Sequence, residues 1–322
     1  MTKNKYLIPL LLSAGLLAAC DDSDSQYTDF NLAISDAPVD DLTSVIVCFN
    51  AVELNGQSDL TFEVGQDEAA IAANDICKDE QGNTIPNTVG IDLFEYTGMD
   101  AISFISSAQI EAGEYSQLRL QMSPGSYAII KGTENTDNVE TVPVVVPSNE
   151  LKLDGFTAAI GGVLNFTVEF DLRQGMTNPV GKEEYFLKPR AVRLVDNSEI
   201  GHITGDVAES FLLDNSCRYA PADLTEPVAA VYLFENADVA LEDLADHGGA
   251  ESEQALTSVG VFYDGVDSYN FEIGYVNAGT YGIAVTCDTT DNPEEDDVVE
   301  FLELKAIDVL ESNEPTNVTF GL

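Results

Sequence analysis

The strict alternation of apolar and polar residues in LNFTVEFDL places the strongest constraint on the fold of this 322-residue chain. The apolar set is Leu164, Phe166, Val168, Phe170 and Leu172, and the polar set is Asn165, Thr167, Glu169 and Asp171. Successive side chains of a β-strand point to opposite faces, so the pattern predicts one face in a core and one in water. SQLRLQM repeats it, with Leu118, Leu120 and Met122 opposed to Gln117, Arg119 and Gln121.

Shorter segments of this kind extend the pattern along the chain. Further strands are expected at 30–34, 44–54, 90–94, 142–146 and 185–195, then at 202–208, 228–234, 260–263, 269–275, 280–287, 299–305 and 317–320. Segments 67–75, 100–110 and 238–247 are expected to form short helices. Short strands joined by turns predict an all-β protein with minor α content, built as two antiparallel β-sandwich modules. NSEIGHITGDV restarts the pattern after Asp196, so we expect modules at 30–196 and 197–322.

Two strands share an entry motif. Ala-Gly-Glu-Tyr at 112–115 leads into SQLRLQM, and Ala-Gly-Thr-Tyr at 278–281 leads into GIAVTC. Glycine permits a tight turn, and a buried tyrosine ring keeps its hydroxyl within reach of a backbone group. We expect the same corner in both modules.

The first residues have the anatomy of a lipoprotein signal peptide. Lys3 and Lys5 precede an apolar run at 7–17, which is too short to span a bilayer. Leu-Ala-Ala-Cys at 17–20 resembles the bacterial lipobox, which implies cleavage after residue 19 and acylation of Cys20, palmitate included. The polar segment 20–29 is then an acidic tether, and Asp21 favours the inner over the outer membrane.

The charge of the chain excludes two classes of partner. The formal net charge is −44, from 13 basic and 57 acidic residues. A field of that sign repels nucleic acid and anionic lipid headgroups. The expected membrane contact is therefore the lipid on Cys20, in a cell-envelope protein that faces the periplasm or the surface, and the expected partner is an unidentified envelope protein or glycan.

The remaining four cysteines are expected to form disulfides, because an exported protein resides in an oxidising compartment. Proximity in the sequence favours Cys48 with Cys77 and Cys217 with Cys287. The competing interpretation is a zinc site of four thiolates. It is disfavoured because the chain contains no C-x-x-C pair.

The sequence contains few of the residues and none of the common motifs that are typical of enzymes. His202 and His247 are the only histidines, and each is expected to be solvated or to cap an element. G-x-S-x-G, H-E-x-x-H and G-x-x-x-x-G-K are all absent. We therefore expect a non-catalytic binding or structural protein. A hydrolase built on a carboxylate pair stays open as an alternative, because acidic residues are abundant.

A calcium-dependent binder of carbohydrate or another ligand is the other alternative. Two acidic loops supply the oxygen ligands that calcium takes, although neither fits the D-x-D-x-D-G loop. The candidate ligands are Asp36, Asp40, Asp41, Asp288, Asp291 and Asp296. A solvated loop is the competing interpretation of each cluster, and for Asp36 an Asx turn is preferred. Calcium is the only cofactor that the sequence suggests. Tyr263, Tyr269 and Tyr275 are expected to pack as strand residues, with a tyrosine platform for sugars as the alternative.

Four segments resemble the bacterial family called domain of unknown function 4382. They are LAISDAPVDDLTSVIVCFNAVEL, IEAGEYSQLRLQM, VPSNELKLDGFTA and LNFTVEFDLRQGM with YFLKPRAVRLVD, all within 30–196. The resemblance implies an exported lipoprotein and supplies no catalytic residue. GHITGDV and VNAGTYGIAVTC are similar to prealbumin-like or carboxypeptidase-regulatory-like domains, which implies that 197–322 is a non-catalytic β domain that binds or spaces.

Overall fold

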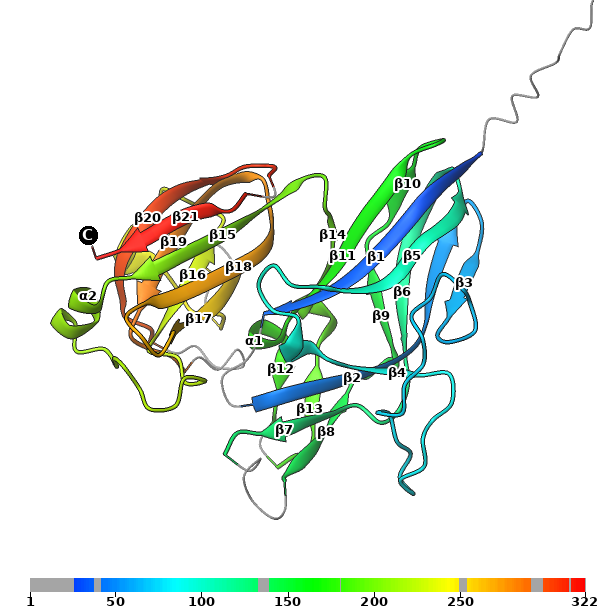
Figure 1. The fold of residues 1–322 in the computed structure, drawn as a ribbon. Helices are drawn as coiled ribbons and strands as arrows, with labels where there is room; N and C mark the ends of the chain where they lie inside the picture. Colours follow the sequence, from blue (N-terminus) through cyan, green and yellow to red (C-terminus); the bar gives the residue numbers. More distant parts are fainter. Residues whose placement is uncertain are drawn as a thin grey trace, which may run out of the picture.

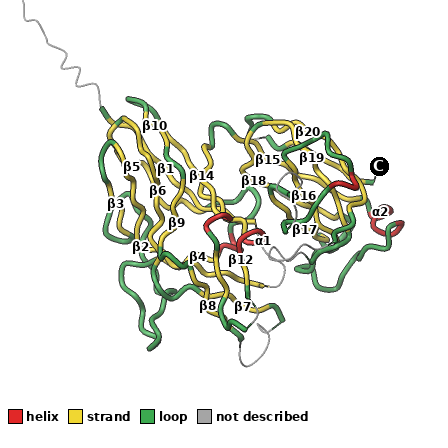
Figure 2. Tube along the Cα trace, turned by 180° about the vertical axis from the view of Figure 1, so that it is seen from behind, coloured by secondary structure: helices red, strands yellow, loops and turns green. Residues whose placement is uncertain are grey.

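The protein is described from a computed structural model that covers residues 26–37, 42–132, 139–179, 181–248, 254–290, 298–312 and 314–321. Three β-sheets account for most of it, which confirms the all-β prediction. Two sheets are formed by residues 27–196, here called the first module, and one by residues 200–320, the second module. The modules lie side by side, and short α1 (Leu172–Gly175) lies where they meet (Figures 1 and 2).

The first module is a sandwich of a four-stranded and a ten-stranded sheet. The four-stranded sheet has the order β14 (Val192–Asp196), β11 (Val163–Asp171), β1 (Tyr27–Ala37), β5 (Ile102–Glu111). The main path of the other is β10 (Phe156–Ala158), β6 (Gly113–Met122), β2 (Leu42–Gly56), β7 (Tyr127–Ile130), β8 (Thr141–Val145), β13 (Tyr185–Leu187), β12 (Met176–Thr177). Strands β3 (Leu60–Glu63) and β4 (Val89–Asp92) pair with β2, and β9 (Glu150–Leu153) pairs with β6.

The core of the first module lies between these two sheets. The ring of Phe156 stacks between Phe30 of the smaller sheet and Tyr115 of the larger one, with ring centroids 5.4 and 5.1 Å apart. Burying one such aromatic side chain contributes about 1.5–3 kcal/mol. The apolar residues of the two alternating segments therefore face one shared core, as predicted for Phe166, Val168 and Leu118.

The second module is a seven-stranded sheet that nearly closes on itself. Its order is β20 (Phe301–Val309), β19 (Gly279–Thr286), β16 (Ala229–Phe234), β17 (Thr257–Tyr263), β18 (Tyr269–Asn277), β15 (Ile200–Val207), β21 (Thr316–Phe320). Strand β17 pairs first with β16 and then, through Phe262 and Tyr263, with β18. It thus joins the two halves of the barrel-like sheet. These seven strands are the seven that the sequence predicts.

Three strand pairs are parallel within otherwise antiparallel sheets: β1 with β11, β8 with β13 and β15 with β21. The first pair matters most here, because it brings the C-terminal ends of β1 and β11 together. Ala37 lies opposite Asp171 in this register. The start of β1 lies at the end of the first module that is remote from the second (Figure 1).

Two predicted helices are wrong. Residues 102–111 form β5, and residues 67–75 follow an irregular path beside it, with Ala70 bridged to Ile105. The backbone N–H groups of Ile71 and Ser106 donate to Phe104 and Ala69, respectively, so this segment bonds to β5 instead of to itself. Of the third predicted helix, only the 3-10 turn η3 (Leu241–Asp243) forms in the described part. The remaining helical turns are η1 (Leu93–Glu95), η2 (Pro189–Ala191) and α2 (Glu209–Asp214).

Both modules contain the predicted tyrosine corner. The hydroxyl of Tyr115 donates to the carbonyl of Glu111 at 3.0 Å, and the hydroxyl of Tyr281 donates to that of Asn277 at 2.9 Å. In each case the acceptor lies four residues earlier, in the strand before the turn. Each bond closes the turn between two consecutive strands and contributes about 1 kcal/mol.

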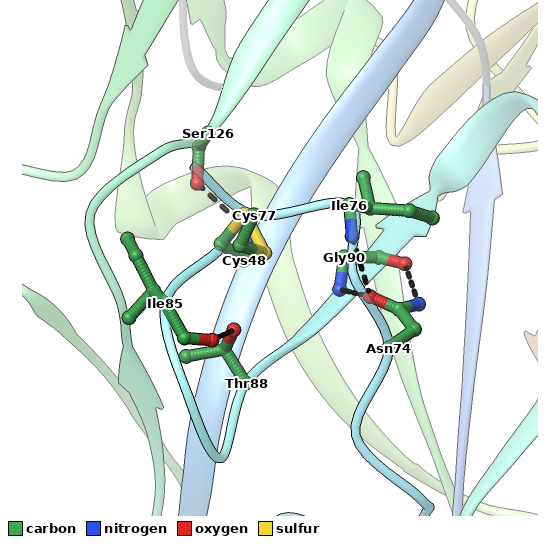
Figure 3. The surroundings of a disulfide bond; sticks show 8 residues. All are labelled: Cys48, Asn74, Ile76, Cys77, Ile85, Thr88, Gly90 and Ser126. Atoms are coloured by element: carbon green, nitrogen blue, oxygen red, sulfur yellow. Dashed lines mark hydrogen bonds between the residues drawn. A yellow bond between two sulfur atoms is a disulfide. The ribbon is translucent and has the colours of Figure 1, made fainter. Parts of the chain in front are cut away.

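The cysteines pair as their proximity favours. Cys48 is bonded to Cys77 and Cys217 to Cys287. Figure 3 shows the first bridge, which ties the long segment before β4 to β2. Asn74 holds the same segment, because its amide donates to the carbonyl of Gly90 and its side-chain oxygen accepts from the Gly90 N–H, each at 2.9 Å. Disulfides of this kind indicate a compartment outside the cytoplasm.

Candidate functional site

The polar face of β11 is buried near the end of the strand, where the sequence predicts that it faces water. Thr167, Glu169 and Asp171 are 0%, 4% and 8% exposed. Arg193 lies opposite Glu169 on β14, and its guanidinium donates to the Glu169 carboxylate at 2.6 Å. Tyr275 of the second module lies near Thr167 and Glu169, which both affect the pKa of its hydroxyl. The joint between the modules is therefore built on the polar side of a first-module strand.

A bulge in β18 aims Tyr275 across this joint. The register of β15 against β18 shifts at this point, and Tyr275 has a φ of +52°, in the left-handed region. His202 stabilises the bulge, because its Nδ1 accepts the Tyr275 N–H at 3.2 Å. The Tyr275 hydroxyl then donates to the carbonyl of Met99 in the first module at 3.2 Å. Burial lowers the pKa of His202, which suits a neutral ring that accepts this bond.

The backbones of the two modules approach closely beside Tyr275. A Cβ on Gly274 would lie 1.8 Å from the carbonyl oxygen of Gly98, so only glycine fits there. Val195, Ile200 and Tyr275 form a small apolar cluster across the same boundary. The modules are thus packed against each other as well as linked by the chain.

Three carboxyl groups gather where β1 and β11 end. Asp36 continues the core-facing series of Phe30, Leu32 and Ile34 and is 2% exposed. Burial raises the pKa of Asp36 well above its usual value, and the charges of Asp171 and Glu169 raise it further. Burial likewise raises the pKa of Glu169 to about 7, although Arg193 lowers it. Asp171 caps α1 by accepting the Gln174 N–H at 2.9 Å.

A cavity of about 690 Å³ opens beside this cluster, between the modules. From the first module, it is lined by Asp171, Gln174, Arg190, Ala191 and Arg193. From the second module, it is lined by Phe234, Glu235, Asn236, Val239, Gln254, Ala255 and Leu256. A cavity of this size is in the range of small-molecule sites, which often lie between domains.

The predicted calcium ligands are only partly within the described residues. Asp36 lies with Glu169 and Asp171 at the ends of β1 and β11. The residues that an Asx turn at Asp36 would engage, 38–41, lie outside the described residues, so that interpretation stays a prediction. Asp288 accepts from both the N–H and the hydroxyl of Thr290, each at 3.0 Å, as a capped turn does. Asp40, Asp41, Asp291 and Asp296 lie outside the described residues, so calcium binding by these loops stays a prediction.

In the part of the chain that the structure describes, no three His, Cys, Asp or Glu side chains are grouped as a metal site requires. No helix among the described residues is long and apolar enough to cross a bilayer. Cys20 and the predicted signal peptide lie outside the described residues.

Both histidines differ from expectation. His202 is only 9% exposed and serves the bulge at Tyr275, while His247 is 2% exposed and its Nε2 lies 2.8 Å from the Ser258 hydroxyl. Neither is solvated, because the strands of the second module enclose them. The three tyrosines of the suggested sugar platform pack instead. Tyr269 is 1% exposed and stacks against Tyr263 at 5.0 Å, and Tyr275 lies in the joint.

The cavity residues were missed at the sequence level, although a signal was present. Three of the five arginines of this acidic chain fall within 173–193, namely Arg173, Arg190 and Arg193. Arg190 and Arg193 line the cavity, and Arg173 lies in α1. The alternation in LNFTVEFDL places Glu169 and Asp171 on the polar face of the strand, but it does not predict that this face is buried.

A family model described as a domain of unknown function, DUF4382, matches residues 27–189. The chain belongs to this family. The match contains β1, β11 and the cavity residues Asp171 and Gln174, but Arg190, Ala191 and Arg193 lie beyond it. No curated protein matches the chain significantly.

Two solved structures share a weak likeness with the whole chain. One is a candidate adhesin from Bacteroides ovatus, at 9% identity and a TM-score of 0.19, covering 96% of this chain and 94% of that one. The other is a candidate cell-adhesion protein from Bacteroides eggerthii, at 10% identity and a TM-score of 0.15, covering 91% and 98%. At such TM-scores, neither likeness bears on the function of this chain.

Proposed function

We propose that this protein is a lipid-anchored, non-catalytic protein of the bacterial cell envelope that binds a ligand between its two modules. The observation that carries the proposal is the 690 Å³ cavity at the joint, lined from both sides. Two disulfides support a location outside the cytoplasm. The lipobox-like sequence at 17–20 supports acylation of Cys20, and Asp21 favours the inner membrane.

The length of β1 supports a separation between the lipid anchor and the cavity. Tyr27, where β1 begins, lies within the last residues of the proposed tether 20–29, and Ala37 lies at the joint, opposite Asp171. At about 3.3 Å per residue, the 11 residues of β1 separate these ends by roughly 33 Å. An anchor at Cys20 would therefore hold the cavity away from the membrane, within reach of a soluble ligand or an envelope partner.

The second module supplies one wall of the cavity in this proposal. We assign it to the prealbumin-like or carboxypeptidase-regulatory-like β domains, on the strength of GHITGDV, VNAGTYGIAVTC and the seven short strands. In that role it positions Phe234, Asn236 and Gln254 opposite the first module. Its tight packing at Gly98 and Gly274 fits a rigid wall.

A carboxylate-pair hydrolase is the second candidate, favoured by one observation. Glu169 has a pKa raised by burial to about 7, which suits a general acid, and Asp171 lies close enough to contribute to that shift. Both carboxylates already have structural partners, namely Arg193 and the N–H of Gln174. Hydrolysis of a glycoside or ester above the buffer rate, abolished by Glu169→Gln, would establish this candidate in place of the first.

The anchoring part of the proposal is tested by labelling and fractionation. Cells that express the full chain are fed a palmitate analogue, and the label is sought on the protein and its Cys20→Ser variant. We expect label and membrane association for the parent, and neither for Cys20→Ser. A Cys48→Ser variant controls for loss of a different cysteine and should still be labelled. An unlabelled parent found in the soluble fraction would contradict the proposal.

A further inference from the structure

One end of the first module exposes three large apolar side chains. Tyr27, at the start of β1, is 46% exposed, and Val163, at the start of β11, is 60% exposed. Ile160, in the turn between β10 and β11, is 64% exposed. The start of β1 and this turn lie at the same end of the module, remote from the second module (Figures 1 and 2). These three residues are here called the apolar end.

Hydrogen bonds hold the turn and the start of β1 together. The Gly161 N–H donates to the Tyr27 carbonyl at 2.9 Å. The Thr28 hydroxyl donates to the Ala159 carbonyl at 2.5 Å. Ile160 lies between these two bonded positions of the turn. A lipid surface offers fewer hydrogen-bond partners than water does, so backbone groups that are already paired lower the cost of contact with it.

The turn lies in an uncharged segment of a strongly charged chain. Residues 155–168, GFTAAIGGVLNFTV, contain no charged residue, whereas 22% of the whole chain is charged. Bringing a charged side chain into a bilayer is costly, so contact with lipid requires a segment of this kind. Tyr27 fits the same surface, because tyrosine rings are enriched where a membrane meets water.

The length of the chain before β1 determines what lies next to the apolar end. Only six residues, 21–26, separate Cys20 from Tyr27. Seven residue steps of fully extended chain span at most about 25 Å. A lipid on Cys20 therefore keeps the apolar end within that distance of the bilayer, and such a tether gives the bilayer a high effective concentration at this end.

Acidic residues border the apolar end and decide which lipid surface it fits. Glu111 lies opposite Tyr27 on β5, and Glu114 of β6 accepts from the Thr157 hydroxyl at 2.9 Å. Strands β1, β5, β10 and β11, which meet at this end, contain no lysine or arginine. Anionic headgroups are therefore repelled, whereas neutral, zwitterionic headgroups fit.

We infer that the apolar end rests on the surface of the membrane that holds Cys20, with Tyr27, Ile160 and Val163 among neutral headgroups. This inference rests on the proposed lipid anchoring and adds a second, non-covalent contact to it. The lipid attaches the protein, and the apolar end orients it. Strand β1 then runs away from the membrane, and the cavity at the joint faces the aqueous compartment.

The test uses the full, lipidated chain in phosphatidylcholine vesicles that contain spin-labelled lipid, which quenches a fluorophore at short range. Ala159→Cys places an environment-sensitive fluorophore in the turn, and Val266→Cys places it at an exposed apolar residue of the second module as a matched control. The four cysteines of the two modules are in disulfides, so the introduced thiol reacts selectively. We expect quenching and a blue-shifted emission at position 159, and neither at position 266.

A second substitution in the Ala159→Cys protein measures the apolar contribution. Ile160→Asp should lower the ratio of docked to undocked protein about tenfold, because it removes a large apolar side chain from the contact and adds a charge. Val266→Asp is the matched control and should leave the quenching unchanged. Replacing part of the phosphatidylcholine with phosphatidylglycerol should weaken the quenching at position 159, because the bordering carboxylates repel anionic lipid.

Vesicle flotation measures anchoring separately from docking. A chain that floats with the vesicles but is not quenched at position 159 would overturn the inference and leave the anchoring intact. A chain that does not float would overturn the anchoring and the docking with it. Quenching that is equal at positions 159 and 266, unaffected by Ile160→Asp, or undiminished by phosphatidylglycerol would also overturn the inference.

Discussion

Strands β6 and β11 have the same period-two alternation but different surroundings. On β6, Gln117 and Arg119 are partly exposed beside solvent, whereas on β11 Thr167 and Glu169 are buried under the second module. Each strand also has an ion pair. Arg119 lies 3.5 Å from Glu150 in a partly exposed pair, and Arg193 lies 2.6 Å from a Glu169 side chain that is 5% exposed. Alternation therefore identifies the polar face of a strand. Whether that face is exposed to solvent depends on whether another part of the chain packs against it.

The largest difference is expected when each arginine is removed. Arg193→Met should lower the free energy of unfolding by about 3 kcal/mol at pH 8, because it leaves the buried Glu169 carboxylate without its cation. Arg119→Met should cost less than about 1 kcal/mol, because water replaces the lost partner of Glu150. Urea unfolding measures the free energy of unfolding of both variants. Equal decreases in the two variants would contradict the burial of the pair between Arg193 and Glu169.

The pH dependence of stability is the next largest effect. The pKa of Glu169 is about 7 in the folded chain against 4.5 ordinarily, so the folded state binds more protons between these values. The contribution of Glu169 to stability is therefore greatest at and below about pH 4.5 and decreases as the pH rises to about 7. The total decrease is roughly 3 kcal/mol, because each pKa unit corresponds to about 1.36 kcal/mol. The raised pKa of Asp36 acts in the same direction.

The charged and titratable groups that face Glu169 are Arg193, Asp171, Asp36 and Tyr275. Glu169→Gln keeps an acceptor for Arg193 but cannot titrate, so unfolding curves between pH 4.5 and 8 should flatten in this variant. Glu150→Gln on the strand next to β6 is the matched control. It should leave the slope of the parent in this range, because Arg119 and Lys152 lower the pKa of Glu150 instead of raising it. An unchanged slope in Glu169→Gln would rule out a neutralised buried carboxyl.

The smallest predicted effect concerns the contact that covers β11. Tyr275→Phe removes the hydroxyl that donates to Met99 across the joint and should cost about 1 kcal/mol. Tyr263→Phe removes a hydroxyl whose bond to the Val266 carbonyl is exposed and should cost less. Thermal unfolding of the two variants compares them directly. A larger loss for Tyr263→Phe would contradict the assignment of Tyr275 to the joint.

The strands of the second module were predictable because their buried and exposed residues alternate over short segments between turns. Strand β5 was not, because bulges opposite Phe30 and Leu32 shift its register, so Phe104, Ile105 and Ala108 are buried at helix-like spacing. Alanine-rich 67–75 has helical propensity, but its backbone bonds to β5 instead. The cavity was beyond local patterns, because Arg190 and Asn236 meet only once both modules are folded.

Thiol labelling measures whether the second module buries Thr167. Thr167→Cys and Ser116→Cys place one reporter on the covered side of β11 and one at an exposed position of β6. Native protein is treated with a thiol reagent, and the labelled peptides are identified by mass spectrometry. We expect rapid labelling at position 116 and protection at position 167 until the chain is unfolded. Equal labelling rates at the two positions would contradict it.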